Sequence, residues 1–121
     1  NEEAGGDYFG FCLNVGHANL TNRNIKEYIK ELGHRLTILH IHDNNGLEDM
    51  HMIPYSYLST GASHVCDWQG FVEGLKEIGY PGVLAFETFR IFSAYPKPAH
   101  TSALKLISDI GHYWVDLIEN K

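Results

Sequence analysis

Imidazole and carboxylate side chains are concentrated after one apolar run of the chain. His40, His42 and Asp43 end this run, and Asp49 and His51 follow in a polar segment. Neutral imidazole nitrogens and carboxylate oxygens are the donors that proteins use to bind divalent metal ions, and both groups also transfer protons. One polar residue at the end of a strand marks only where the chain meets water. Five such residues so close together predict a functional site.

Two further apolar runs end in residues of the same kind. Asn14 and His17 follow the run Tyr8–Leu13, and Glu87 follows the run Val83–Phe86. The carboxyl ends of parallel strands meet at one edge of a sheet, and this edge carries the chemistry in open α/β sheets and barrels. We therefore expect the polar residues of all three runs to lie along one rim.

The rest of the pattern alternates strands with helices in an α/β domain. Short apolar runs without polar interruption are typical of parallel strands covered on both faces, and apolar residues three and four apart indicate amphipathic helices. The stretch 14–17 is expected to turn at its glycine, and 52–66 to form a long loop that covers a substrate. The expected strands are about 8–13, 36–41 and 83–87, and the expected helices are about 24–33, 67–79 and 100–119.

The composition argues against several classes of protein. The 121 residues carry a net charge of −6 and are 44% hydrophobic, which suits one folded domain and does not favour a nucleic-acid-binding surface. No apolar run reaches the length of a membrane span, and the first residues do not resemble a signal peptide. Cys12 and Cys66 lack metal-type spacing, so we expect a reduced, cytoplasmic setting without a membrane partner. Because the chain begins with Asn1, we expect a processed product or a piece of a longer protein.

Four short motifs give the chain a family resemblance. Residues 13–19, Leu-Asn-Val-Gly-His-Ala-Asn, resemble the Leu-Asp-x-Gly-His-Ala-Asn signature of the sugar phosphate isomerase/epimerase superfamily. That superfamily has a xylose isomerase-like barrel and includes tagatose-type epimerases and relatives of endonuclease IV. The other motifs follow in the family's order: His-Ile-His-Asp at 40–43, Asp-Met-His at 49–51, and Gly-Tyr-Pro-Gly at 79–82 ahead of Glu-Thr at 87–88.

The resemblance implies a partial barrel. Residues 1–121 then form the C-terminal three β/α units of a xylose isomerase-like (β/α)8 TIM barrel, since a complete barrel takes ~250 residues. Three strands cut from a barrel have two unpaired edges. We therefore expect self-association, or pairing with the missing N-terminal half.

The resemblance also implies a metal site. The family's Asp, His and second Glu ligands correspond to Asn14, His40 and Glu87, and the family's first Glu would lie upstream of this chain. The expected ion is Mn²⁺ or Mg²⁺, with Zn²⁺ as the alternative. Asn14 is neutral where the family has aspartate, which removes one negative charge and weakens binding. In the endonuclease IV relatives, the pair that matches Asp49 and His51 binds an additional metal.

Three further roles are implied for other side chains. His17 matches a histidine that contacts substrate or, in the endonuclease IV relatives, a metal. Arg90 and Tyr55 are expected to contact substrate, although a surface salt bridge is an equal alternative for Arg90. We take only one of His40 and His42 to face the barrel interior and choose His40, which leaves His42 facing a helix or supporting another ligand.

These expectations lead to three functional hypotheses. The first is the C-terminal part of a metal-dependent sugar or sugar phosphate isomerase or epimerase, in which Glu87, with His17, transfers a proton through an enediolate. The second is an endonuclease-IV-like metal phosphodiesterase, against which the acidic balance and Asn14 count. The third is a catalytically inactive half-barrel that acts as an interaction protein. In the first hypothesis the substrate is a small sugar or sugar phosphate, and the chain alone is expected to be inactive.

Overall fold

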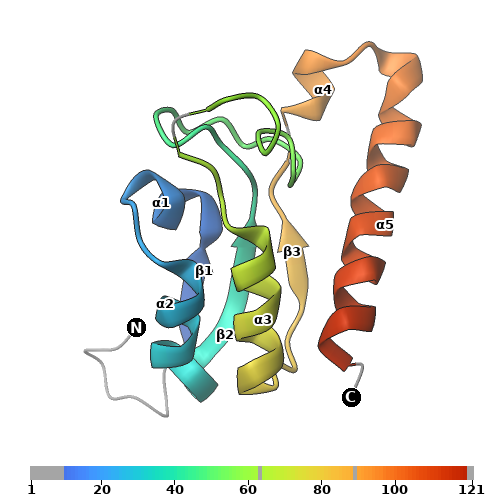
Figure 1. Cartoon of the computed structure of the whole chain (residues 1–121). Coiled ribbons are helices and arrows are strands. Elements are labelled where there is room, and N and C mark those ends of the chain that lie inside the picture. The colour runs from blue at the N-terminus through green and yellow to red at the C-terminus, as the bar shows by residue number, and fades with distance from the viewer. Residues whose placement is uncertain (1–9, 63, 89, 120–121) are drawn as a thin grey trace.

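The computed structural model describes residues 10–62, 64–88 and 90–119, and its strands form a parallel sheet. The strands are β1 (Phe11–Asn14), β2 (Leu36–Ile41) and β3 (Leu84–Phe86), and they lie in this order in the sheet. Asn14 pairs with His40, and His40 pairs with Ala85, so the ends of the strands lie at one level. All strands point toward the same end of the molecule (Figure 1).

The strand bounds differ a little from those expected. The expected strand 8–13 lies partly outside the described residues, and β1 continues one residue further, to Asn14. β2 occupies 36–41, as expected. β3 is shorter than the expected 83–87, because Val83 and Glu87 flank it without strand geometry.

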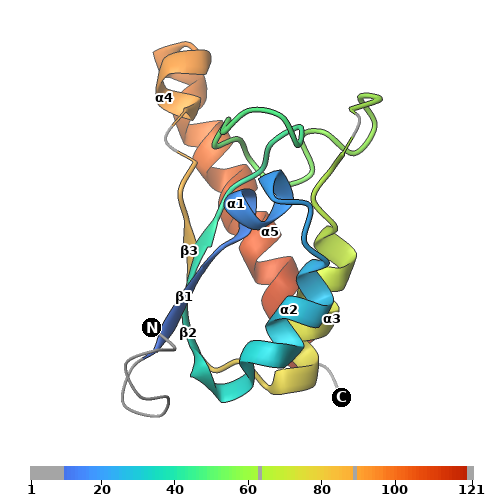
Figure 2. The same cartoon turned by 90° about the vertical axis from the view of Figure 1, so that its left-hand side faces the viewer.

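Three long helices cover one face of the sheet (Figure 2). Asn24 starts the first of them by accepting the backbone N–H of Glu27 at 3.0 Å. Asp67 caps the second by accepting the N–H of Gly70 at 2.9 Å. The helices are α2 (Ile25–Leu32), α3 (Trp68–Ile78) and α5 (His100–Glu119), with short 3₁₀ turns at Gly33–Arg35 and Lys97–Ala99.

Aromatic stacking attaches α3 and α5 to the sheet. The Trp68 and Trp114 rings stack with their centroids 5.3 Å apart, and Phe86 of β3 stacks on Trp114 at 5.6 Å. Both tryptophans are almost fully buried, as is Leu39 of β2. Burial of large apolar side chains is the main favourable term in folding. This cluster therefore holds the strands that carry the candidate site in a rigid arrangement.

The opposite face of the sheet is open in the described part of the chain. Figure 2 shows α2, α3 and α5 all on the same side of the strands. Ile38 of β2 is 49% exposed, and Cys12 of β1 is also exposed. Parallel sheets are normally covered on both faces. The open face is consistent with the expected pairing with a further part of a barrel or with a second copy.

A short helix replaces the turn expected at 14–17, so that expectation is wrong. Helix α1 (Val15–Leu20) begins there, because Asn14 adopts an extended backbone and its Oδ1 accepts the N–H of His17 at 3.0 Å. An asparagine in this position is a strong helix start. Another short helix, α4 (Ile91–Ala94), follows β3.

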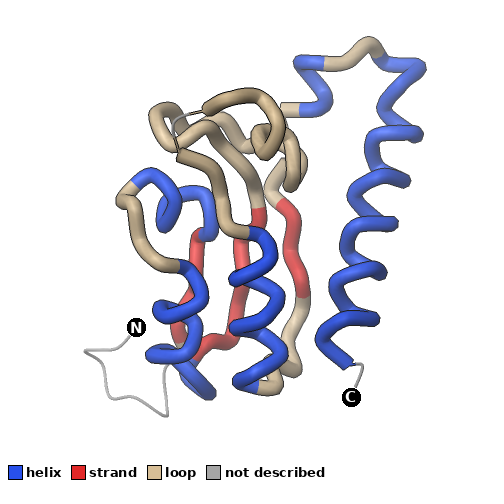
Figure 3. The backbone as a smooth tube through the Cα atoms, viewed as in Figure 1, coloured by secondary structure: helices blue, strands red, loops and turns tan. Residues whose placement is uncertain are grey.

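The segment between β2 and α3 is the long loop expected from the sequence, and it lies over the carboxyl ends of the strands (Figure 3). Asp43 and Met52 bridge its first part through two backbone hydrogen bonds of 2.8 and 3.0 Å. The buried Asp43 carboxylate accepts from the Ser56 N–H at 3.0 Å and the Trp68 Nε1–H at 3.4 Å. Burial raises the pKa of Asp43.

None of the described helices is long and apolar enough to cross a membrane.

Candidate metal and substrate site

His40 and Glu87 meet at the carboxyl ends of adjacent strands. Nδ1 of His40 lies 3.3 Å from Oε2 of Glu87, and both side chains are about one third exposed. Sγ of Cys12 lies 3.6 Å from the same ring nitrogen. Burial and the charge of Glu87 raise the pKa of the Cys12 thiol. The structure thus brings together the two expected metal ligands, His40 and Glu87, and adds a thiol that the sequence spacing did not indicate.

Asn14, the third expected ligand, already has two hydrogen-bond donors. Its Oδ1 accepts the backbone N–H of His17 at 3.0 Å and lies 2.8 Å from Nε2 of His42. An amide oxygen can only accept, so Nε2 of His42 carries the proton. A carbonyl oxygen has two lone pairs. Both are therefore used, one to start α1 and the other to hold His42.

His42 does not face away from His40, and the expectation that only one of them faces the barrel interior is wrong. Residues two apart on a strand point to the same side. Following that geometry, His40 contacts Cys12 of β1, and His42 contacts Asn14 of the same strand. The His42 ring also stacks on His51, with centroids 3.9 Å apart.

The His42 ring is enclosed and neutral. Burial, reinforced by the neighbouring His51, lowers its pKa to about 4. Nδ1 of His42 is buried and has no hydrogen-bond partner among the described residues. A Cβ at Gly16 would lie 2.3 Å from this nitrogen, so only glycine leaves room for the ring. His42 is therefore locked with Nε2 directed at Asn14.

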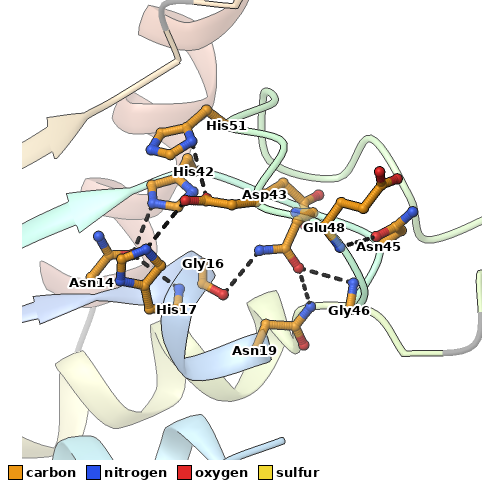
Figure 4. A network of polar contacts seen from close by, with 12 residues as sticks. Asn14, Gly16, His17, Asn19, His42, Asp43, Asn45, Gly46, Glu48 and His51 are labelled. Carbon is orange, nitrogen blue, oxygen red and sulfur yellow. Dashed lines mark hydrogen bonds and ion pairs between the residues drawn. The ribbon is translucent and has the colours of Figure 1, made fainter. Parts of the chain in front are cut away.

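A second group of donors lies beside the first. The ligand atoms of His42, Asp49 and His51 all lie within 4.8 Å of one another. Asp49 joins two histidines: its Oδ1 is 3.0 Å from Nδ1 of His51, and its Oδ2 is 3.3 Å from Nε2 of His17. Figure 4 shows His17, His42 and His51 converging from α1, from the end of β2 and from the loop. The expected pair Asp49 and His51 thus lies with His17.

A buried asparagine pair holds α1 against the loop. Oδ1 of Asn44 accepts from Nδ2 of Asn19 at 2.7 Å and from the N–H of Gly46 at 3.0 Å. Nδ2 of Asn44 donates to the carbonyl of Gly16 at 2.9 Å. The sequence alone predicts no role for either asparagine, although Asn19 is the last residue of the 13–19 motif. The burial of Asp43 and Asn44 could not be predicted, because polar residues after a strand are usually solvated.

Tyr55 and Arg90 are the two further residues expected to contact the substrate. The Tyr55 hydroxyl accepts the indole N–H of Trp114 at 2.7 Å, and its ring packs near Trp68 on the helix-covered side. Arg90 is exposed and precedes α4. The Tyr55 hydroxyl is thus engaged away from the groups around His40 and His42, and the substrate contact of Arg90 stays a prediction.

The donors fit a divalent metal ion in part. His40 and Glu87 present a nitrogen and an oxygen in contact, and a second set comprises His42, Asp49 and His51. These are the donor types that such ions prefer. Asn14 fits less well, because its oxygen is engaged. These residues could hold a metal ion through His40 and Glu87, with a further position near Asp49.

Parallel strands with donors at their carboxyl ends occur both in open α/β sheets and in α/β barrels. Residues 2–115 match the family described as xylose isomerase-like TIM barrel. The chain belongs to this family, which confirms the expected partial barrel and the resemblance carried by its motifs.

Two uncharacterized proteins and one solved structure are similar to the chain. The chain is 30% identical over 105 residues to the uncharacterized protein y4fM of Sinorhizobium fredii, covering 83% of this chain and 32% of the relative. It is 36% identical over 88 residues to the uncharacterized protein MJ1311 of Methanocaldococcus jannaschii, covering 70% of this chain and 27% of the relative. A crystal structure of a D-tagatose 3-epimerase-like protein matches with a TM-score of 0.55 and 30% identity, covering 88% of this chain and 37% of that one. The chain thus spans about a third of the length of these proteins.

Proposed function

We propose that the protein carrying this chain is a metal-dependent isomerase or epimerase of a sugar or sugar phosphate. The observation that carries the proposal is the contact of 3.3 Å between His40 and Glu87 at the ends of adjacent strands. In α/β barrels, residues at these strand ends act on the substrate. The D-tagatose 3-epimerase-like protein among the structural matches supports the same class of reaction.

Glu87 is the proposed base. Isomerisation and epimerisation require removal of a proton from a carbon next to a carbonyl and its return at another position or on another face. The Glu87 carboxylate is about one third exposed, so it is open to a substrate, and His40 holds one of its oxygens. A divalent ion at His40 and Glu87 would polarise the carbonyl and stabilise the charge of the enediolate.

His17 is the proposed substrate-binding residue. Its side chain is 59% exposed, and its Nε2 lies 3.3 Å from Oδ2 of Asp49, which fixes the direction of the ring. An oriented imidazole can hydrogen-bond a sugar hydroxyl, and such positioning lowers the entropy cost of reaching the transition state. Asp49 thus supports His17 rather than reacting itself.

A second candidate is a metal phosphodiesterase of the endonuclease IV kind. The group His42, Asp49 and His51 supports it, because clustered metal ions stabilise both the attacking and the leaving oxygen in phosphodiester cleavage. The net charge of −6 counts against DNA as a partner. Cleavage of DNA at an abasic site, with no turnover of ketoses, would favour this candidate over the isomerase.

The uncovered face of the sheet is the basis for a proposal about association and activity. We propose that the chain by itself is inactive and self-associates or pairs with a further part of a barrel, because Cys12, Ile38 and His40 lie uncovered on that face. The third hypothesis is an inactive half-barrel that serves only in interaction. It predicts the same association but no catalysis by the intact protein. Activity of the intact protein separates the two.

The test is a ketose screen with the intact protein, expressed from its complete coding sequence and assayed for bound metal. Glu87→Gln keeps the size of the side chain and removes the base, so it should lower kcat at least ~10²-fold. Glu73→Gln is the matched control, because Glu73 lies on the outer surface of α3, where it pairs with Lys26. The proposal would be contradicted if Glu87→Gln had the same kcat as the control Glu73→Gln. It would also be contradicted by an intact protein that neither binds metal nor turns over a ketose.

A further inference from the structure

Asp43 is a buried carboxylate that the proposed mechanism does not use. It follows β2 and is 1% exposed. Its Oδ1 accepts the N–H of Asn44 at 2.8 Å, and its Oδ2 accepts the N–H of Ser56 at 3.0 Å and the Nε1–H of Trp68 at 3.4 Å. Burial of a carboxylate is unfavourable unless its oxygens are hydrogen-bonded. Both oxygens of Asp43 have donors, and these donors attach the loop to the start of α3.

The same residue closes the part of the loop that carries Asp49 and His51. The backbone N–H and carbonyl of Asp43 bond the carbonyl and N–H of Met52 at 2.8 and 3.0 Å. Because the Asp43 carboxylate also accepts the N–H of Ser56, two residues that follow His51 are held to Asp43. The stretch from Asp43 to Met52 is therefore a closed loop, and the position of Asp49 depends on that closure.

Two residues beside this closure have a left-handed backbone. The φ angle is +55° at His51 and +76° at Tyr55. Residues with large side chains rarely adopt this conformation, and it persists only where surrounding contacts hold it. The hydrogen bonds of Asp43 to Met52 and Ser56 lie directly next to these two residues. Loss of the Asp43 carboxylate should therefore let the loop relax.

A relaxed loop would no longer hold the His17 ring. Oδ2 of Asp49 lies 3.3 Å from Nε2 of His17, and Oδ1 of Asp49 lies 3.0 Å from Nδ1 of His51. The His17 side chain is 59% exposed, so packing alone does not fix its direction. The contact with Asp49 does so, and Asp49 lies in the loop that Asp43 closes.

We propose that Asp43 is a positioning residue of the substrate site, and that its carboxylate holds the loop in the place where Asp49 directs His17 toward the substrate. Asp43 itself does not contact the substrate, because its side chain is buried. The inference rests on the proposed role of His17 in substrate binding and names the residue that keeps His17 in place.

Asparagine cannot replace this aspartate. It has nearly the same size, but only one of its two polar atoms accepts hydrogen bonds. The NH2 group in Asp43→Asn would face either the N–H of Asn44 or the N–H groups of Ser56 and Trp68. Two donors that face each other leave buried polar groups unsatisfied. The variant should thus release the loop with little change in the shape of the side chain.

Kinetics of the intact protein, with a ketose that it turns over, provide the first readout. Asp43→Asn should raise KM ~10-fold, as expected for the loss of one hydrogen bond to the substrate. It should change kcat less, since Glu87 follows β3 and does not belong to the loop. In a His17→Ala background Asp43→Asn should raise KM no further, because the ring to be positioned is absent. A general loss of structure would act equally in both backgrounds.

The histidine NMR signals are a second readout, and they need no activity. The His17 signal, assigned with His17→Ala, should move in Asp43→Asn in the same direction as in Asp49→Asn. The double variant of Asp43 and Asp49 should show the same shift as Asp49→Asn alone. The signals of His100 and His112 on α5 should stay in place.

Asp67→Ala is the matched control. It removes another carboxylate at the end of the same loop, together with the N-cap of α3. It should lower stability and leave KM and the His17 signal unchanged. Trp68→Phe is a milder variant for the case that Asp43→Asn does not fold. It removes one donor to Asp43 and should move the His17 signal in the same direction by less.

The outcomes separate this inference from the proposed function. A folded Asp43→Asn with an unmoved His17 signal, or with equal effects on KM in the presence and absence of His17, overturns the inference and leaves the proposed function in place. If Asp43→Asn does not fold, an unmoved His17 signal in Trp68→Phe overturns the inference. An intact protein that turns over no ketose contradicts the proposed function, and the NMR signals then still decide whether Asp43 positions His17.

Discussion

Gly16 and His42 are in contact so close that no side chain fits between them. A Cβ at residue 16 would lie 2.0 Å from Cε1 and 2.3 Å from Nδ1 of His42. His51 stacks on the same ring at 3.9 Å, and Asn14 receives its Nε2–H at 2.8 Å. The start of α1 therefore fixes the position of the His42 ring and directs its Nε2–H at Asn14.

Gly16→Ala should destabilise the protein and move His42. Atoms in packed interiors do not come as close as 2.3 Å, so the ring or α1 must shift, and overpacking of this kind costs ~1–3 kcal/mol. Urea unfolding measures the loss, and the histidine NMR signals report the new position of the ring.

A double variant and a matched glycine test the cause. In a His42→Ala background, Gly16→Ala should cost much less, because the clash is gone. Gly111→Ala on α5 is the control, since a Cβ there would approach Phe86 only to 3.4 Å. An equal loss for Gly16→Ala with and without His42 would show that the contact is not the cause.

The buried His42 should make the metal-free protein less stable in mild acid. Its pKa is lowered from 6.5 to about 4 in the folded state, so the unfolded chain binds the proton more readily. The free energy of unfolding is therefore unaffected by this residue above pH 6.5. It falls by on the order of 3 kcal/mol as the pH drops from 6.5 to about 4.

His42→Asn provides the test of this pH dependence. Urea unfolding between pH 7 and 4, with a chelator present, should show a shallower decline for the variant than for the wild type. A decline of equal steepness in both proteins would assign the acid sensitivity to other groups, such as the carboxylates.

The alternation of elements and the strand-end donors could be predicted because their signals are local. Apolar runs, Asn24 and Asp67 each act within a few residues, and the structure has β2 and the starts of α2 and α3 where these signals place them. The contact of His40 with Glu87 followed from parallel pairing alone. The spacing of His40 and His42 also predicts that both side chains point to the same side, because side chains on a strand repeat every two residues.

Other features depend on contacts that no local pattern contains. Tyr55 lies in a loop without periodicity, and its hydroxyl is taken by Trp114, 59 residues away in the sequence. Helix α1 depends on a side-chain cap and on the fit of Gly16 against His42, which is distant in the sequence. Cys12 lies beside His40 only because β1 and β2 pair, and a separation of 28 residues keeps this contact out of any local pattern.

Asn14→Asp should strengthen metal binding at His40 and Glu87. An aspartate has a second oxygen, so one can keep the His17 and His42 contacts while the other adds a charged ligand. Affinity should rise by about tenfold, because affinity for hard cations increases with the charge of the ligands. Isothermal titration with Mn²⁺ measures the change.

Asn45→Asp controls for the added charge. Asn45 also accepts backbone N–H groups, from Leu47 and Glu48, but takes no part in the His40 contacts. It should leave Mn²⁺ affinity nearly unchanged. Equal gains from both substitutions would point to general electrostatic attraction instead of a new ligand at residue 14.

Trp114 should be a principal source of stability for the end of the chain. Its ring is fully buried, stacks on Trp68 and Phe86, and donates its N–H to the Tyr55 hydroxyl at 2.7 Å. Trp114→Ala should cost ~3–5 kcal/mol, because it removes this packing and leaves a cavity between α5 and β3. Tyr113→Ala, at a neighbouring position that is 56% exposed, should cost within ~0.5 kcal/mol. Similar losses in urea unfolding would mean that α5 is not anchored through Trp114.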